Sequence, residues 1–384
     1  MRIDSRTVIT GALLSGAILV YIVGLVGWRQ GALFLVGIGA GLILYHAAFG
    51  FTSAWRDMIS KGRGAGLRAQ MIMLAVTAIV FLPLLADGQL WGMELRGSVR
   101  PLSVSVIAGA FLFGVGMQLG GGCASGTLFT AGGGNMRMVL TLVAFIVGSA
   151  LGAYHLPAWQ AAPGFGPVSL LGQFGLGLAL VISLVLFASV WLGSAFVERR
   201  RYGALEKNAT CFATGSWLRG PWPLVAGAVG LAGVNIATLT VAGRPWGVTS
   251  GFALWGSKVA AALGFNVAAW PYWQGPDASA ALEASVFSDI TSVMNFGIIL
   301  GALMAAGLAG RFAPIWRVPW RSLLAAIAGG LLLGYGARIA YGCNIGAYFS
   351  GISSSSLHGW LWFVAALVGN GLGAKLRPAF GLSN

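Results

Sequence analysis

The sequence predicts an all-α protein that crosses a membrane many times and consists of two homologous halves of opposite orientation. Three observations predict this. The chain of 384 residues is 57% hydrophobic and only 8% charged, whereas about 25% of the residues of a soluble domain are charged. Its apolar residues form long runs, and one glycine-rich stretch occurs twice. Such a chain cannot cover its core with charged residues and needs lipid as part of its solvent.

The apolar runs predict the helices. Runs long enough for a span of ~20 residues lie at 8–27, 31–50, 69–88, 103–121, 138–154, 168–194, 222–242, 290–309, 322–341 and 359–374. The first is too long for the apolar region of a signal peptide and is expected to be a retained helix. Shorter or glycine-broken pieces lie at 123–132, 247–263 and 343–352. We expect roughly nine to ten spanning helices and about four short re-entrant ones, which need protein or water around them.

The repeat aligns residue by residue. Ile107–Phe129 lies over Ile327–Phe349 at a constant offset of 220 residues, the separation of Cys123 and Cys343. Identical residues at this offset are Gly109, Gly114, Gly116, Gly122, Cys123, Gly126 and Phe129. After a slip of one residue, Val147–Ala153 lies over Val368–Ala374, and Gly50–Trp55 resembles Gly247–Phe252 more weakly. The predicted division is a first half at 1–194, a basic linker at 195–220 and a second half at 221–384.

The basic residues predict topology rather than nucleic-acid binding. The formal net charge is +14, and most Lys and Arg residues cluster between apolar runs, at 56–68, 198–207 and 311–321. Short basic loops are typical of the cytoplasmic side of a membrane protein. No basic stretch is long or interleaved with aromatic residues, so no nucleic-acid partner is expected.

These clusters give the two halves opposite orientations. With all three clusters inside, the loop at 91–100 lies outside, and the helix before Cys123 starts outside. The helix before Cys343 follows a cytoplasmic cluster and starts inside. An inverted repeat with broken helices is typical of secondary transporters. Strict inversion also places the amino terminus outside, although Arg2 and Arg6 favour the cytoplasm.

The repeated cysteines are the strongest candidate site. Cys123 and Cys343 each follow flexible glycines and precede a piece too short to span. A lone cysteine is usually a small buried apolar residue, but two at equivalent positions in glycine turns favour a function. Turn N–H groups attract anions, and a thiol adds a weak, soft donor. Cys211 has no repeat partner and is expected to be an ordinary loop thiol.

The sequence resembles the YeeE/YedE family of membrane proteins, which includes thiosulfate transporters. The resemblance covers nearly the whole chain and is carried by Phe51–Asp57, Gly120–Asn135, Arg244–Lys258 and Gly334–Pro378. It implies thiosulfate uptake across the bacterial inner membrane by a multi-pass protein, with Cys123 and Cys343 as relay thiols. The implied partners are thiosulfate and membrane lipid, together with a small cytosolic sulfur-carrier protein. The family has a further cysteine where this chain has Gly50, and the wider family handles other sulfur or selenium species.

The candidate substrate-contacting residues surround these motifs. They are Cys123, Cys343, Gly121, Gly122, Ser125, Gly126, Gly342, Asn344, Gly346, His46, Gly50, Thr52 and Thr249. His46 precedes Gly50 by one turn and either donates to the anion or packs against a carbonyl. Arg338 either attracts a dianion or extends from a helix end toward water. The hydroxyls of Ser353–Ser356 either line the path or cap short helices.

Two classes of function compete. The first is a transporter of a small sulfur-containing anion, and the second is a membrane thiol–disulfide oxidoreductase. An oxidoreductase needs an attacking thiol near a resolving one, usually in CxxC spacing, and this chain has no CxxC. No ATP-binding glycine loop, haem-attachment motif or metal-spaced cluster appears in the sequence. We therefore expect no cofactor and a transporter rather than an enzyme.

Overall fold

The computed structural model describes residues 3–206, 216–314 and 317–383. Within them, ten segments are helical, long and apolar enough to cross a membrane, and each overlaps one of the ten predicted runs. The ten long helices are α1 Ser5–Leu25, α2 Trp28–His46, α4 Ala65–Asp87, α5 Val104–Gly120, α7 Met136–Gln160, α8 Leu170–Tyr202, α10 Leu224–Ala242, α13 Ile290–Leu308, α14 Trp320–Ile339 and α16 Leu357–Leu376.

Three short helical segments lie where the sequence predicts them. They are α6 Ala124–Gly132, α11 Thr249–Ala262, and the π-helical turn η5 Asn344–Phe349, which continues into α15 Ser350–Ser353. A fourth, α3 Phe51–Arg56, continues into the π-helical turn η1 Asp57–Lys61. Further short helices are α9 Ser216–Arg219 and α12 Pro276–Glu283, with 3₁₀ turns η2 Val267–Ala269, η3 Pro271–Trp273, η4 Val286–Ser288 and η6 Arg377–Phe380.

Two small antiparallel strand pairs, which the sequence does not predict, join the helix ends. The strands are β1 Gln89–Leu90, β2 Met93–Glu94, β3 Pro101–Ser103 and β4 Gly164–Pro167. β1 pairs with β2 as a hairpin, and β3 pairs with β4. Together they fix the segment between α4 and α5 against the rest of the protein.

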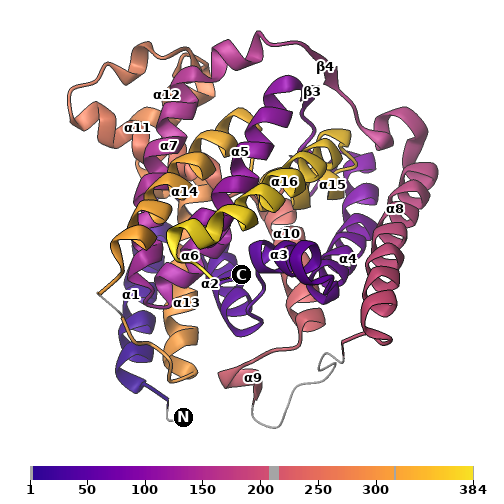
Figure 1. Cartoon of the computed structure of the whole chain (residues 1–384). Coiled ribbons are helices and arrows are strands. Elements are labelled where there is room, and N and C mark those ends of the chain that lie inside the picture. Colours follow the sequence, from indigo (N-terminus) through magenta and orange to yellow (C-terminus); the bar gives the residue numbers. More distant parts are fainter. Residues whose placement is uncertain (1–2, 207–215, 315–316, 384) are drawn as a thin grey trace.

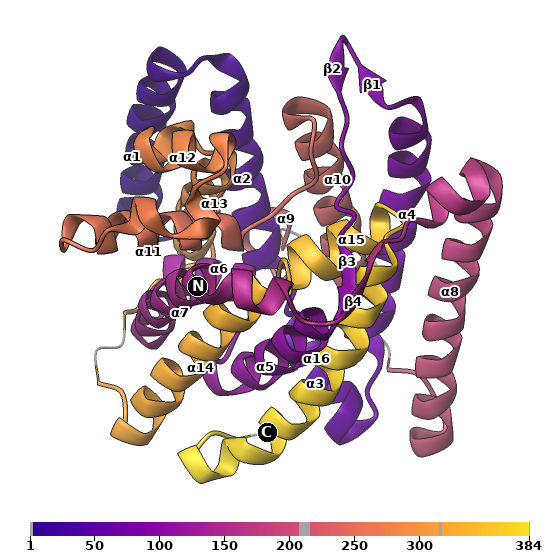
Figure 2. The same cartoon turned by 90° about the horizontal axis from the view of Figure 1, so that it is seen from above.

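In Figure 1 helices α5 and α16 lie near the centre, and α1 and α8 lie at opposite edges in both views (Figures 1 and 2). In the most apolar 18-residue stretch of each edge helix only 17% is buried inside the protein, whereas 67% of the corresponding stretch of α5 and α6 is buried. The edge helices therefore present apolar surface to lipid, and the centre is enclosed by protein.

Glycines allow the central helices to cross backbone to backbone. A Cβ atom on Gly114 of α5 would overlap the carbonyl of Ala366 in α16, and one on Gly334 of α14 would overlap the carbonyl of Phe145 in α7. Gly114 and Gly334 are aligned in the repeat, so equivalent positions make both crossings. Small residues at crossings are how membrane helices pack closely.

The helix directions define two faces. The basic face is the one on which α4 begins; there Tyr202, at the end of α8, donates to the Lys61 carbonyl at 2.7 Å. The distal face is the one on which α4 ends, and it carries the loop at 88–100. By the positive-inside rule the basic face is expected in the cytoplasm.

The position of the amino terminus differs from the expectation of strict inversion. Helices α2 and α13 run in the same direction, because Gly37 meets Met294 and Gly41 meets Ile298. Both therefore end on the basic face. The N–H of Asp4 donates to the carbonyl of Gly307 at the end of α13, at 2.9 Å. The amino end thus lies on the basic face, and expecting it on the opposite side was wrong.

The packing of α1 gives the reason, because α1 packs on α13 and its first residues meet the end of that helix. The other edge helix, α8, packs on α4. Helix α8 continues to Tyr202 and thus includes the first residues of the predicted linker at 195–220. Cys211 lies outside the described residues.

Candidate functional site

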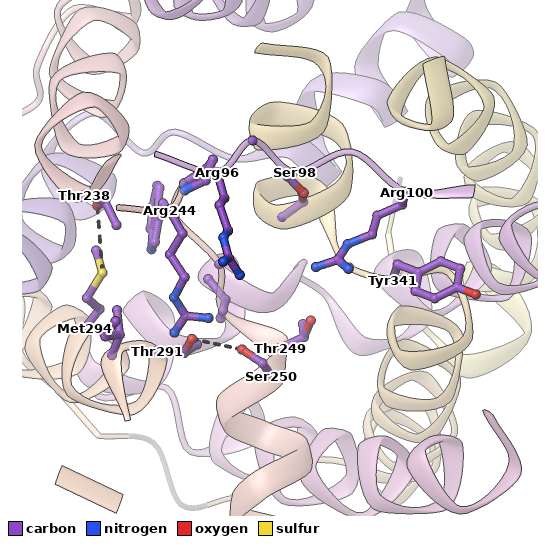
Figure 3. Close-up of a pocket in the computed structure, with 18 of the residues that line it drawn as sticks. Arg96, Ser98, Arg100, Thr238, Arg244, Thr249, Ser250, Thr291, Met294 and Tyr341 are labelled. Atoms are coloured by element: carbon purple, nitrogen blue, oxygen red, sulfur yellow. Dashed lines mark hydrogen bonds between the residues drawn. The ribbon is translucent and has the colours of Figure 1, made fainter. Parts of the chain in front are cut away.

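A cavity of about 530 Å³ lies at the distal face (Figure 3). Its walls are the loop at 96–100, the segment at 244–250, side chains of α10, α13 and α14, and the turn that carries Gly342 and Gly346. Because Gly342 and Gly346 flank Cys343, the cavity reaches the turn in which that thiol lies.

Arginines dominate the lining. They are Arg96, Arg100, Arg244 and Arg338, and no Asp or Glu is among the lining residues. In Figure 3 the side chains of Arg96 and Arg100, from the loop at 96–100, and of Arg244, from the segment at 244–250, extend toward the middle of the cavity. Converging guanidinium groups in a concave site favour an anion with several oxygens.

Neighbouring carboxylates offset part of this charge. Arg96 pairs with Glu94 at 2.8 Å, and both side chains are largely exposed. Arg244 is 3.9 Å from a carboxylate oxygen of Asp289, the N-cap residue of α13. Both acids lie behind the arginines rather than on the cavity lining, so the cavity itself remains positive.

The other arginines have no acidic partner among the described residues. Arg338 Nη1 donates to the hydroxyl of Tyr272 at 2.5 Å. The Arg100 guanidinium makes no hydrogen bond or ion pair to a described residue. Desolvation by the surrounding protein, and then the positive charge of Arg338, lower the pKa of Arg100. Arg100 is thus a cation with free donors, held where an anion would relieve its repulsion by Arg338.

The serine run holds the loop that carries Arg96 and Arg100. Ser354 accepts from the N–H of Ser98 at 3.0 Å, and Ser356 accepts from the N–H of Arg100 at 3.5 Å. The Ser98 hydroxyl donates to the carbonyl of Gly346 at 3.2 Å. Among the described residues the hydroxyls of Ser354 and Ser356 neither line the cavity nor cap a short helix, and they bind the backbone of the arginine loop instead.

Hydroxyls line the wall opposite Arg100. Thr249, a candidate residue, lies there at the start of α11, and the hydroxyls of Ser250 and Thr291 are 2.9 Å apart (Figure 3). Such groups donate to an anion without adding charge.

In the first cysteine turn the thiol bonds to residues of the same turn. Cys123 is the N-cap residue of α6 and is 2% exposed. Its sulfur accepts from the N–H of Gly126 at 3.4 Å and lies 3.4 Å from the hydroxyl of Ser125. The candidate residues Ser125 and Gly126 therefore contact this thiol directly.

The second cysteine turn is looser. Cys343 is the N-cap residue of η5, is 1% exposed and makes no side-chain capping bond. It belongs to the same buried core as Cys123, and the short elements that the two cysteines begin, η5 and α6, are in contact. The fold thus brings together residues that are 220 positions apart in the sequence.

Backbone geometry requires glycine at two turn positions. Gly121 has φ +92°, and a Cβ there would lie 2.6 Å from Arg137 Nη1. Gly342 has φ +157°, and a Cβ would lie 2.8 Å from the Ala347 nitrogen. Gly346, in contrast, has open space around it. The Gly122 position is tight, with Met138 and Gly126 near 3.1–3.2 Å from a Cβ.

Comparison with known proteins identifies the family of this chain. The family model described as Sulphur transport matches residues 46–372. The chain belongs to the sulphur-transport (YeeE/YedE) family. It is therefore a multi-pass membrane transporter of sulfur compounds rather than an enzyme.

Individual relatives agree with this membership. The thiosulfate transporter TsuA of Spirochaeta thermophila is 30% identical over 355 residues, which cover 88% of this chain and 95% of the relative. TsuA of Escherichia coli is 25% identical over 358 residues, which cover 87% and 91%. The probable transporter YedE of Escherichia coli is 32% identical over 170 residues, which cover 43% of this chain and 41% of YedE.

The candidate residues His46, Gly50 and Thr52 lie away from the distal cavity. His46 ends α2 on the basic face, with its ring 5.4 Å from that of Trp222, and its Nδ1 makes no hydrogen bond to a described residue. Gly50 lines a separate cavity of about 250 Å³ on that face. The Thr52 hydroxyl is buried and unpartnered, and its carbonyl accepts from Gln118 Nε2 at 3.1 Å. The fold does not bring these residues to the distal cavity.

Sequence reasoning missed Arg96, Arg100 and Arg244 as site residues. A signal was available, because the loop at 91–100 is predicted to lie outside, where short loops usually carry few arginines. Arginines that break this rule are candidates for binding an anion.

Proposed function

We propose that this transporter imports thiosulfate across the inner membrane of a bacterium, from the distal face to the basic face, past Cys123 and Cys343. The observation that carries the proposal is the arginine-lined cavity that ends at the Cys343 turn. Its charge suits a small dianion, and its volume exceeds what such an ion needs, so the ion arrives with part of its hydration water. The relatives named thiosulfate transporters support this choice of ion.

The two buried thiols suit the next step. A thiosulfate ion has a terminal sulfur and three oxygens, and an S–H group is a weak, soft donor that a sulfur atom can accept from. Weak donors hold an ion without trapping it, which conduction requires. Cys343 lies nearest the cavity and would meet the ion first, and Cys123 would follow on the other half.

We also infer that the two halves are related by inversion. Helix partners exchange in the way this requires: α7 packs on α14 as α16 packs on α5, and α2 packs on α13 as α10 packs on α4. The glycines at the crossings exchange in the same way. This relation supports a path through the middle of the molecule, where the short helices of both halves meet.

The test is uptake of radiolabelled thiosulfate into proteoliposomes, with sulfate and selenite as competitors. Saturable uptake that thiosulfate inhibits far better than sulfate supports the proposal. If selenite competes best, the substrate is a selenium species and the thiosulfate assignment is wrong.

A further inference from the structure

Asn344 follows Cys343 directly and carries a fully buried amide with no hydrogen-bond partner among the described residues. It is 0% exposed, and neither its Nδ2 nor its Oδ1 makes a hydrogen bond to a described residue. Burying an unpaired amide is costly, so such groups are rare in folded proteins and need an explanation. The packing of the protein does not supply one here.

In the turn around Cys123 the neighbouring polar side chain contacts the thiol, unlike Asn344. There Cys123 is followed by Ala124 and Ser125, and the Ser125 hydroxyl lies 3.4 Å from the Cys123 sulfur. In the second half Asn344 and Ile345 follow the cysteine. Each thiol thus has one neutral polar neighbour, but only the one in the first half is engaged with its thiol.

Asn344 also lies in the turn that borders the distal cavity. Gly342 and Gly346, which bracket it, both line the cavity, and Ser98 of the arginine loop bonds to the Gly346 carbonyl. An ion that leaves the arginines for the Cys343 thiol reaches this turn. The amide therefore belongs to the turn that connects the charged cavity with the second cysteine.

We propose that Asn344 determines specificity by donating its amide N–H to an oxygen of the anion while the sulfur end meets the Cys343 thiol. This deepens the proposed function and rests on it. A neutral amide replaces a lost hydration bond but adds no charge, so it recognises the oxygens without holding the dianion as an arginine would. The amide thus binds the oxygen end of a thiosulfate-like ion while the thiol binds its sulfur end.

The test uses Asn344→Leu, which keeps the approximate shape and removes both polar atoms, and Asn344→Ala in case leucine does not fit. Asn370→Leu is the matched control, because Asn370 of α16 is also fully buried with both amide atoms unpartnered. Thermal melting in detergent and the half-saturating thiosulfate concentration for uptake are measured for each variant.

We expect Asn344→Leu to melt no lower than the unmodified protein, because removing a buried unpaired amide relieves a cost. Its half-saturating concentration should rise about 10–100-fold, the range that one charge-assisted hydrogen bond gives. Asn370→Leu should stay within about twofold.

An unchanged half-saturating concentration in folded Asn344→Leu and Asn344→Ala would overturn the inference and leave Asn344 as a site for buried water only. An equal loss in Asn370→Leu would also overturn it, because the effect would then come from packing. If the unmodified protein takes up no thiosulfate, the proposed function fails first and the inference fails with it.

Discussion

At the scale of single residues, the arginines of the distal cavity conflict with the positive-inside rule that orders the rest of the chain. The basic clusters at 56–68, 198–207 and 311–321 agree with that rule, whereas Arg96 and Arg100 are expected outside. Of the four cavity arginines, only Arg100 has a guanidinium group that makes no hydrogen bond or ion pair to a described residue. Its donors are therefore free to bind an arriving anion.

Replacing this free cation should weaken capture of the ion. Arg100→Gln is expected to raise the half-saturating thiosulfate concentration about 10–100-fold, because one charge-assisted hydrogen bond is worth about 1.5–3 kcal/mol. The rate at saturation should change little. Uptake kinetics in proteoliposomes measure both values.

Arg29→Gln is the control for long-range charge. Arg29 starts α2 on the distal face, is exposed and does not line the cavity. Salt screens exposed charges beyond about 10 Å at 0.1 M, so this variant should stay within about twofold. Equal losses in both variants would show that net charge, not the cavity, sets the affinity.

The thiols give a second prediction at this scale. Cys123→Ala and Cys343→Ala should each remove most uptake and leave expression and melting nearly unchanged, because Cys behaves as a small apolar residue in a core. Cys211→Ala should be nearly silent. Full activity of the Cys123→Ala, Cys343→Ala double variant would refute the relay.

The sequence predicts some of these residues and not others for a physical reason. The repeat identifies both cysteines and their glycines, because a repeated motif stands out from its surroundings. It does not identify Arg244 or Arg100, which come from unrepeated loops and meet only after folding. For His46 the proximity to Gly50 along the chain predicted a shared site, yet the fold turns His46 toward Trp222 and away from the distal cavity.

At the scale of elements, hydropathy predicts all ten long helices because each must satisfy its backbone bonds internally in lipid. Hydropathy does not predict the strand pairs or the turns at 263–289, since they lie between the long helices and depend on tertiary contacts. It does not predict the role of the serine run at 353–356 either. Its hydroxyls look like caps in the sequence, but Ser354 and Ser356 bind the loop at 96–100.

The glycine crossings give a prediction of stability. Gly114→Ala and Gly334→Ala should each lower the melting temperature markedly, because the added Cβ meets the backbone of the partner helix. Overpacking of this kind costs about 1–3 kcal/mol or more. Gly39→Ala in α2 is the control, since a Cβ there has nothing within 4 Å; alanine should leave stability unchanged or raise it by up to ~1 kcal/mol.

Similar losses in Gly114→Ala and Gly334→Ala are what two equivalent crossings require. Melting in detergent, with retained binding of thiosulfate as a second measurement, distinguishes a repacked protein from an unfolded one. A neutral effect at either position would mean that the two crossings are not equally close.

At the scale of the whole molecule, the basic residues of the two faces have different roles. Arginines and lysines on the basic face favour its placement in the cytoplasm, whereas Arg96, Arg100 and Arg244 on the distal face line the cavity. The alignment of the repeat predicts two halves, but it does not predict that α1 packs on α13 and α8 on α4. That pairing depends on the packing of edge helices whose sequences are not repeated, and it is why the amino end lies on the basic face.

The orientation can be tested with single cysteines in a chain that lacks Cys211, since Cys123 and Cys343 are buried. Trp91, which is 81% exposed in the distal hairpin, should react as Trp91→Cys with a membrane-impermeant maleimide in intact cells. Ser5→Cys, at the start of α1, and Arg200→Cys, near the end of α8, should react only after permeabilisation, because both exposed positions lie on the basic face. If Ser5→Cys reacts in intact cells while Arg200→Cys does not, the two ends lie on opposite sides and the proposed orientation is wrong. If all three reactivities are reversed, the cavity faces the cytoplasm, and the same arginines would serve export rather than import.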